Sequence, residues 1–422
     1  MSSRLLSWWD GDLKNPSSNW ILPSQTRSTR LTISRNTARR SRLITNARSV
    51  DMSGVVTQSN RPQYIVPTMA EIADLPWNGF QVASTFSGGG GSCLGYRMAG
   101  FKVVWANEFI PAAQATYKAN HPDSFLDTRD IRKITPEEIL QTVGLTVGDL
   151  DIFDGSPPCA AFSTIGQREK SWGKVKRYSD SAQRVDDLFF EYSRLLKGLQ
   201  PKVFIAENVS GLIKGKAKGY FIEILNELAA CGYRVKAKLL DASWLGVPQS
   251  RERIIFMGVR NDLRLDPVYP KPLRYRYTLT DAIVGCEGFP STPLKPGSKL
   301  HTLYHHATPE VGGRFEDAYK KLYGKLSYFN YSRGLWDRPA RTVVQGSQCL
   351  MHPDEARSYS IPELKRLCSF PDDFKLEGSF PQQWERLGRS VPPVMMAHIA
   401  KTVQKEILEV WKSGTASTPV VG

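Results

Sequence analysis

The stretch DGSPPCAAFS, residues 154–163, follows a short apolar run at residues 150–153. The run predicts a buried strand that ends where the stretch begins. Pro157 and Pro158 fix two successive φ angles and carry no backbone N–H, so they hold Cys159 on a stiff loop. Open α/β sheets place reacting groups just beyond the carboxyl ends of their strands, which makes Cys159 a candidate nucleophile. The alternative is a structural cysteine beside a rigid turn.

The composition restricts the class of protein. The chain has 422 residues, enough for a large core and two domains with a tail. Its net charge is +15, and both the first 68 residues and the remainder carry more Lys and Arg than Asp and Glu. This charge favours a polyanionic partner such as nucleic acid. Six cysteines without a CxxC pair and six histidines without ligand spacing predict neither a disulfide framework nor a metal site. No apolar run is long enough to span a membrane, and we expect a reduced compartment.

The first 68 residues differ from the rest of the chain. They are rich in Ser, Thr, Asn and Arg, and residues 13–50 contain no acidic side chain. No helical or alternating apolar period persists, so we expect a disordered basic extension that is dispensable for catalysis. The same composition is typical of an organelle transit peptide, and a natural start at Met69 is a third interpretation.

A glycine-rich loop follows the first predicted strand. Residues 81–87 (QVASTFS) predict this strand, which runs into four glycines at 88–91, and a helix is expected over 93–99. Strand, glycine loop and helix bring backbone close to a nucleotide-like ligand. A second strand over 101–106 precedes Glu108, where an acid is placed to bind ribose hydroxyls. The lack of a Walker lysine and of a clean GxGxxG pattern favours a smaller adenosine ligand than ATP or NAD.

Repeated strand–helix steps continue beyond the cysteine loop. A strand over 203–206 delivers Glu207 at its carboxyl end, and Gln249, Arg251 and Arg253 alternate before a further apolar strand. Period-two spacing places the two arginines on one face. The pattern predicts a doubly wound, Rossmann-like, mostly parallel α/β sheet.

Two segments lack this regular pattern. Residues 164–181 carry basic side chains around Trp172, as expected of a solvated loop or of a phosphate-contacting lid. From about residue 266, proline is frequent, aromatic residues are dense and alternation disappears. We expect a smaller, irregular, β-rich domain there, followed by a helix over 394–410.

The motifs together, in this order, resemble those of the DNA (cytosine-5) methyltransferases over about residues 80–411. The matching motifs are the glycine loop, SPPC at 156–159, ENV at 207–209, the Gln249, Arg251 and Arg253 triplet, RPARTV at 338–343, FPDDF at 370–374 and VPP at 391–393. The resemblance implies transfer of a methyl group from S-adenosylmethionine to C5 of a cytosine flipped out of double-stranded DNA. It further implies that the Cys159 thiolate adds to C6, that Glu207 contacts N3 and that Arg253 holds the O2 side of the base.

The resemblance also assigns individual residues and segments. The implied catalytic residues are Cys159, Glu207, Arg253, Arg251 and Pro158. The implied cofactor-binding residues are Phe86, Ser87, Gly88, Gly90, Gly91, Glu108, Asp130, Ile131, Pro157, Ser390 and Val391. DNA contacts are expected at Arg168, Lys174, Gln249, Arg274 and Arg333, and no metal is expected. The implied division is an extension over 1–68, a catalytic domain over 78–265 with 386–412, a target-recognition domain over 266–385, and a frayed tail over 413–422. We expect a monomer in the cytoplasm of a bacterial or phage-infected cell, associated with the nucleoid and not with a membrane.

The sequence departs from the family pattern in three places. The loop has four consecutive glycines, Ala160 stands where glutamine is usual, and Arg389 stands where asparagine is usual.

Three other functions are alternatives to DNA methylation at C5. An RNA substrate is the first, although the Cys-Phe-Thr signature of the tRNA-modifying branch does not occur. A silent DNA-binding homologue would have no reason to keep Cys159, Glu207 and Arg253. Methylation of an exocyclic amine would need an aromatic residue after the two prolines.

Overall fold

The computed structural model describes residues 61–158, 175–177, 182–184, 187–213, 218–286, 289–345 and 348–414. The first 60 residues of the predicted extension lie outside this set, as do Cys159, Arg168 and Lys174. The chain divides after Pro62, and the unit that begins at Gln63 holds every element discussed below. Within the described ranges, none of the helices combines the length and the apolar character needed to cross a membrane.

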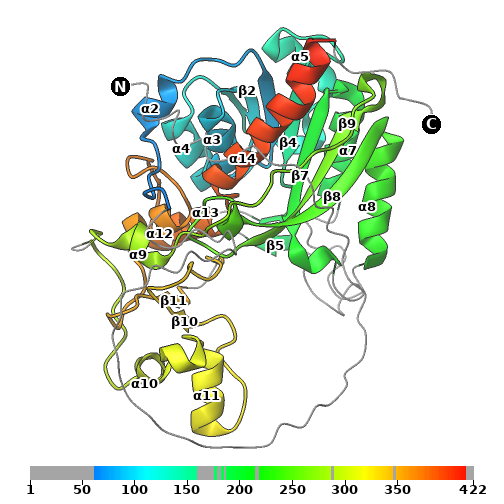
Figure 1. The fold of residues 1–422 in the computed structure, drawn as a ribbon. Helices are drawn as coiled ribbons and strands as arrows, with labels where there is room; N and C mark the ends of the chain where they lie inside the picture. The colour runs from blue at the N-terminus through cyan, green and yellow to red at the C-terminus, as the bar shows by residue number, and fades with distance from the viewer. Residues whose placement is uncertain are drawn as a thin grey trace, which may run out of the picture. The chain divides into compact units, whose positions relative to one another are not determined.

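A seven-stranded sheet forms the centre of this unit (Figure 1), in the order β3-β2-β1-β4-β7-β9-β8. Its strands are β1 (Gln81–Thr85), β2 (Lys102–Asn107), β3 (Phe125–Asp127), β4 (Ile152–Gly155), β7 (Val203–Val209), β8 (Tyr233–Asp241) and β9 (Glu252–Arg260). Strands β1, β2, β3, β4 and β7 pair in parallel, whereas β9 is antiparallel to both β7 and β8. The predicted mostly parallel α/β sheet is confirmed. Outside it, β5 (Val175–Arg177) and β6 (Ala182–Arg184) form an antiparallel pair.

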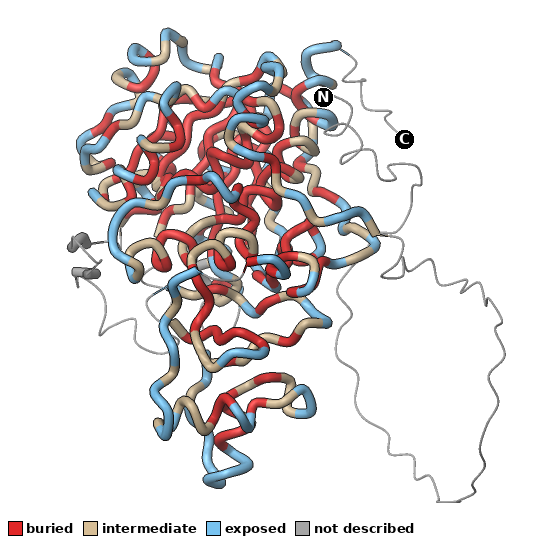
Figure 2. Tube along the Cα trace, turned by 90° about the vertical axis from the view of Figure 1, so that its left-hand side faces the viewer, coloured by how far each residue is buried: buried red, intermediate tan, exposed pale blue. Residues whose placement is uncertain are grey.

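Helices cover both faces of the sheet, which is why its central strands are continuous apolar runs. On one face, α5 (Pro136–Val143), α7 (Leu188–Leu199) and α8 (Lys218–Ala230) pack against Ala83, Phe153 and Phe204. On the other, α3 (Gly91–Met98) contacts β4 through Tyr96, and α14 (Pro393–Val403) lies beside α3 (Figure 1). Figure 2 shows the buried backbone concentrated in these layers. The predicted helix over 394–410 is observed as α14, a π-helical turn (Gln404–Leu408) and α15 (Glu409–Lys412). The remaining helices of this part are α2 (Met69–Ala73) and α4 (Pro111–Asn120).

The strand order creates a crevice for a ligand at the carboxyl ends of the strands. The chain leaves β1 for β2 and β3 on one side, and then returns to β4 on the other side. The carboxyl ends of β1 and β4 therefore diverge at a topological switch point. Because β9 is antiparallel to β7, its amino end lies at the same edge, with Arg253 paired to Val209.

The region predicted to be β-rich contains mainly short helices. They are α9 (Leu279–Ile283), α10 (Lys299–His306), α11 (Phe315–Tyr323), α12 (Ile361–Leu367) and α13 (Phe380–Arg389), while β10 (Ser332–Arg333) and β11 (Leu350–Met351) have two residues each. The irregular character was predicted correctly, but the β-rich content was wrong. Two of the prolines taken as a sign of irregular structure, Pro362 and Pro381, lie in the first turns of helices, where the missing N–H has no cost. This region has its own apolar cluster around Leu303, Phe315 and Tyr319.

The predicted boundary at residue 68 is too late. The Tyr64 hydroxyl donates a hydrogen bond to the Arg366 carbonyl oxygen at 2.7 Å, and the Tyr64 ring lies with its centroid 4.9 Å from that of Tyr277. The backbone N–H of Met69 contacts Asp373. The residues from Gln63 onward thus pack against the region of α9 and α12, so the folded unit begins before Met69.

Removing Tyr64 is expected to destabilise the folded unit. Tyr64→Ala loses the ring contact and the hydrogen bond, and should lower the free energy of unfolding by about 1–3 kcal/mol, measured by urea denaturation. Tyr64→Phe keeps the ring and should lose only about 1 kcal/mol. A chain starting at Met69 that is as stable as one starting at Gln63 would contradict this packing.

Candidate active site

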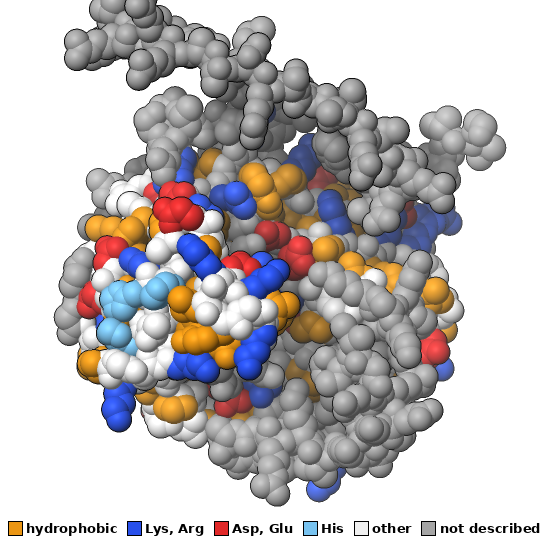
Figure 3. Space-filling model, turned by 90° about the horizontal axis from the view of Figure 1, so that it is seen from below, with side chains coloured by type: hydrophobic (Ala, Val, Ile, Leu, Met, Phe, Trp, Pro, Cys, Tyr) orange, Lys and Arg blue, Asp and Glu red, His pale blue; other side chains and the backbone are white. Residues whose placement is uncertain are grey.

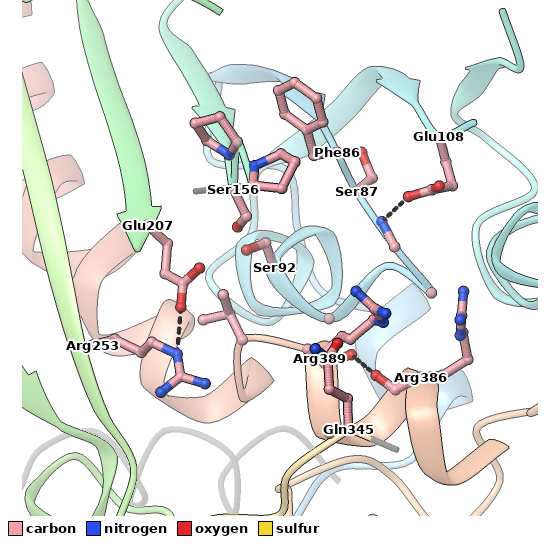
Figure 4. A pocket seen from close by; sticks show the side chains of 18 of the residues that line it. Phe86, Ser87, Ser92, Glu108, Ser156, Glu207, Arg253, Gln345, Arg386 and Arg389 are labelled. Atoms are coloured by element: carbon pink, nitrogen blue, oxygen red, sulfur yellow. Dashed lines mark hydrogen bonds and ion pairs between the residues drawn. The ribbon is translucent and has the colours of Figure 1, made fainter. Parts of the chain in front are cut away.

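A cavity of about 460 Å³ opens at the switch point of the sheet (Figure 4). Its walls come from the segments that follow β1, β2, β4 and β7, from the start of β9, and from two segments far along the chain, residues 342–345 and 386–391. Thirteen residues predicted for catalysis or cofactor binding line it: Phe86, Ser87, Gly88, Gly91, Glu108, Ile131, Pro157, Pro158, Glu207, Arg251, Arg253, Ser390 and Val391. The geometry therefore brings most of the predicted site together.

The glycine loop begins with a strained residue. Phe86 directly follows β1 and adopts a left-handed backbone with φ of 53°. A side chain in this conformation costs about 1–2 kcal/mol, so the surrounding packing must impose it. The ring packs against the apolar core and lines the cavity.

Glu108 is held at the next loop by backbone N–H groups. Its Oε2 accepts from Gly88 and its Oε1 accepts from Ile110, each at 2.7 Å. The residue is only 6% exposed, and burial raises the pKa of Glu108. These bonds give the carboxylate a single orientation at the cavity wall, which suits recognition of ribose hydroxyls.

Two glycines permit close packing around this loop. A Cβ on Gly90, where φ is 91°, would lie 2.2 Å from Nε2 of His121. A Cβ on Gly91 would lie 2.6 Å from the carbonyl oxygen of Val391. The second contact explains why a segment 300 residues away in sequence can complete the cavity, where the resemblance implied cofactor contacts at Ser390 and Val391.

The exit from β4 forms the opposite wall. Ser156, Pro157 and Pro158 line the cavity, and the Asn208 amide donates to the Pro157 carbonyl oxygen at 3.4 Å. At the end of the strand, Asp154 accepts hydrogen bonds from Ser84 and Tyr96. Burial raises the pKa of Asp154 to about 7. Cys159 follows Pro158 directly and lies outside the described residues, as do Arg168 and Lys174.

Glu207 and Arg253 form an ion pair inside the cavity (Figure 4). The distance between Arg253 Nε and Glu207 Oε1 is 2.6 Å, and the two side chains are 13% and 10% exposed. Arg253 also donates through Nη1 to the Glu252 carbonyl oxygen at 2.7 Å. The pair presents an acidic and a cationic group side by side, as needed to contact neighbouring polar atoms of one ring.

Arg251 has a structural role that its predicted catalytic assignment did not include. Its Nη1 donates to the Val343 carbonyl oxygen at 3.0 Å and its Nη2 to that of Gly388 at 2.9 Å. Burial lowers the pKa of Arg251 to about 9. The side chain therefore joins two distant segments of the cavity wall, which leaves fewer donors for a substrate.

Gln249, a predicted DNA contact, is enclosed by other segments of the chain in this structure. The residue is completely buried, and its amide bonds to Leu367, Cys368 and the Val343 backbone N–H. The alternation of Gln249 with two arginines gave no sign that other segments cover it.

The predicted cofactor residues Asp130 and Gly90 and the predicted DNA contacts Arg274 and Arg333 do not line the cavity. Asp130 caps a short helical turn and pairs with Arg132 at 2.9 Å, beside Ile131 but outside the cavity lining. Arg274 is exposed, whereas Arg333 donates to the Pro353 carbonyl oxygen and stacks on Tyr304. Gly90 lies in the loop without lining the cavity.

Sequence reasoning missed several lining residues, namely Asn107, Phe109, Ile110, Thr342, Val343, Val344, Gln345 and Arg386. The RPARTV motif, which ends at Val343, pointed to the 342–345 segment. The unusual arginine at position 389 pointed to the segment that contains Arg386. Within the described residues no group of three or more His, Cys, Asp or Glu side chains could hold a metal ion.

An open α/β sheet, a glycine loop after its first strand and a buried acid after the second define a Rossmann-like protein. Residues 80–405 match the model of the C-5 cytosine-specific DNA methylases, and the chain belongs to that family. The predicted resemblance is confirmed.

Curated relatives cover most of the chain. The Type II methyltransferase M.NgoPII of Neisseria gonorrhoeae is 31% identical over 360 residues, which are 78% of this chain and 97% of that protein. M.NgoFVII, also a Type II methyltransferase of Neisseria gonorrhoeae, is 32% identical over 341 residues, 76% of this chain and 86% of that protein. A prophage-encoded Escherichia coli protein ascribed to the DNA modification methyltransferases shares the fold, with a TM-score of 0.58, 24% identity, and coverage of 78% of this chain and 100% of that one.

Proposed function

We propose that this protein methylates C5 of a cytosine in double-stranded DNA, with S-adenosylmethionine as methyl donor and Cys159 as covalent nucleophile. The observation that supports this most directly is the Glu207–Arg253 pair in the cavity that also contains Glu108 and the Pro157–Pro158 loop. One space thus contains a site for the donor and a site for the base. The Type II methyltransferases among the relatives agree with a DNA substrate.

The residues at the glycine loop fit the donor. The Glu108 carboxylate is oriented for ribose hydroxyls, and Phe86 and Ile131 offer apolar surface for the adenine ring. The buried Arg386 guanidinium at the same wall keeps two donor atoms without hydrogen-bond acceptors among the described residues, as expected of a site for an anionic group. S-adenosylmethionine supplies an electrophilic methyl group on its sulfonium. Gly88 and Gly91 let the backbone approach it closely.

The chemistry requires activation of the cytosine ring, because C5 is a poor nucleophile. Addition of the Cys159 thiolate to C6 makes C5 electron-rich while negative charge develops at N3 and O2. Glu207 donates a proton or a hydrogen bond to N3, and Arg253 stabilises the O2 side. After methylation, a base removes the C5 proton and the electron pair of the C–S bond returns to sulfur, which restores the ring and the thiolate.

The other cysteines are poor candidates for this step. Cys93, Cys231, Cys286, Cys349 and Cys368 are all buried. Burial raises the pKa of Cys93 and of Cys368 to about 11, so neither is a thiolate near neutral pH. This leaves Cys159, next to the cavity in sequence, as the nucleophile.

DNA recognition belongs to the basic surface of residues 266–385. Exposed basic and histidine side chains on and around α10 and α11 are Lys295, Lys299, His305, His306, Lys320, Lys321 and Lys325. Figure 3 shows Lys, Arg and His side chains gathered on the lower face of the molecule, where α10 and α11 lie. Such a surface suits the phosphate backbone. The target base must leave the stack to reach the cavity.

A mechanism-based trap tests the function. With DNA that contains 5-fluorocytosine and with S-adenosylmethionine, the methylated adduct cannot eliminate because fluorine cannot leave as a cation. The wild type should form a complex with DNA that survives denaturing electrophoresis, and peptide mapping should place the link at Cys159. Cys159→Ser should form none, since a hydroxyl ionises far less readily. An adduct at Cys93, or normal turnover by Cys159→Ser, would refute the assignment.

A further inference from the structure

Arg386 is a buried cation with incomplete hydrogen bonding. It lies on α13, its side chain is 2% exposed, and it lines the cavity. Among the described residues, neither Nε nor Nη2 has a hydrogen-bond acceptor. Leaving buried donors of a charged group unpaired is costly, so such a group in a ligand cavity indicates a missing partner.

The nearest carboxylate does not satisfy Arg386. Glu385 Oε2 lies 3.2 Å from Arg386 Nη2, within ion-pair range, but the two atoms form no hydrogen bond. The other oxygen of Glu385 is engaged by Arg389, through Nε at 2.8 Å and Nη2 at 2.7 Å. One carboxylate thus faces two guanidinium groups.

Glu108 is no substitute partner. Both of its oxygens accept backbone N–H groups, although the positive charge of Arg386 lowers the pKa of this carboxyl against the larger effect of burial. Figure 4 shows the guanidinium groups of Arg386 and Arg389 directed into the space below Glu108 and Ser87. An anion bound in that space would lie beside the ribose-binding acid.

We propose that Arg386 binds the α-carboxylate of the methionyl group of S-adenosylmethionine, with Arg389 adding positive charge at the same end. This rests on the proposed function, in which the adenosine part lies at Phe86 and Glu108. The carboxylate is the one anionic group of that ligand, and a guanidinium binds it through two parallel hydrogen bonds. The arginine at position 389, where the family usually has asparagine, then becomes part of a cationic wall rather than an isolated substitution.

Decarboxylated S-adenosylmethionine provides the test, because it differs from the donor only in lacking this carboxylate. Affinities of both ligands for the full chain, without DNA, can be measured by isothermal titration calorimetry. Arg386→Gln should lower the affinity for S-adenosylmethionine by about 10- to 100-fold, the effect of losing a charged hydrogen-bonded pair. The affinity for the decarboxylated ligand should change by less than about 2-fold. Arg386→Lys should retain part of the preference.

Controls separate this inference from the proposed function. Glu108→Gln should lower the affinities for both ligands equally, because both ligands contain the ribose. Arg338→Gln removes the same charge at a residue that pairs with Asp337 outside the cavity, and should change neither affinity. An equal loss for both ligands in Arg386→Gln, or no loss for either, would overturn the role of Arg386. If Arg386→Gln fails to fold by circular dichroism, an unchanged ratio of the two affinities in Arg386→Lys would overturn it. Failure of the wild type to bind either ligand would instead refute the proposed donor.

Discussion

Glu207→Gln is expected to lower the turnover number by about 10²- to 10⁴-fold, the usual contribution of a positioned general acid. The amide is almost isosteric with the carboxyl group, so Arg253 keeps an oxygen acceptor at the position where it now lies 2.6 Å from Glu207. The change removes the carboxyl group's charge and its transferable proton, so the amide can offer N3 a hydrogen bond but cannot give it a proton. Affinity for the donor should stay within about twofold, because Glu207 pairs with Arg253 whereas the proposed ribose contact is made by Glu108.

Single-turnover assays with radiolabelled donor and a cytosine-containing duplex would measure this effect. Formation of the fluorocytosine adduct should slow in parallel, since addition to C6 and proton donation to N3 are coupled. The control is Glu137→Gln on α5, an exposed carboxylate outside the cavity, which should retain wild-type turnover. A rate within tenfold of wild type for Glu207→Gln would show that this carboxyl group is not the acid.

Arg251→Ala is expected to lower the free energy of unfolding by about 3–5 kcal/mol. The substitution removes a fully buried side chain and leaves the carbonyl oxygens of Val343 and Gly388 without their donors. Urea denaturation followed by tryptophan fluorescence would measure the change.

An exposed arginine on the adjacent strand provides the control for this loss. Arg234 lies on β8 with its side chain 48% exposed and its nearest carboxylate, Asp266, 3.9 Å away. Arg234→Ala should change stability by less than about 0.5 kcal/mol. Loss of turnover by Arg251→Ala without loss of stability would restore its predicted role as a catalytic residue.

Local sequence was sufficient for the elements and for much of the site. The apolar runs, the glycine loop and the paired prolines predicted β1, β4 and the loops that follow them, because strand burial and turn geometry depend on residues close in sequence. Glu108 and Glu207 both line the cavity, since each lies at or just beyond the carboxyl end of a strand. The order of the motifs led to the family, which the match over residues 80–405 confirms.

Tertiary structure alone determined which of these residues touch. Arg253 reaches Glu207 because β9 runs antiparallel to β7, and strand direction depends on pairing between segments distant in sequence. The same packing buries Gln249 and commits Arg251 to two carbonyl groups, although both alternate with Arg253 in the sequence. Arg386 lines the cavity because Gly91 admits the segment after α13, a close approach between residues about 300 positions apart. Periodicity reports which face of an element is apolar, but not which distant segment covers that face, so these contacts arise only when the chain packs.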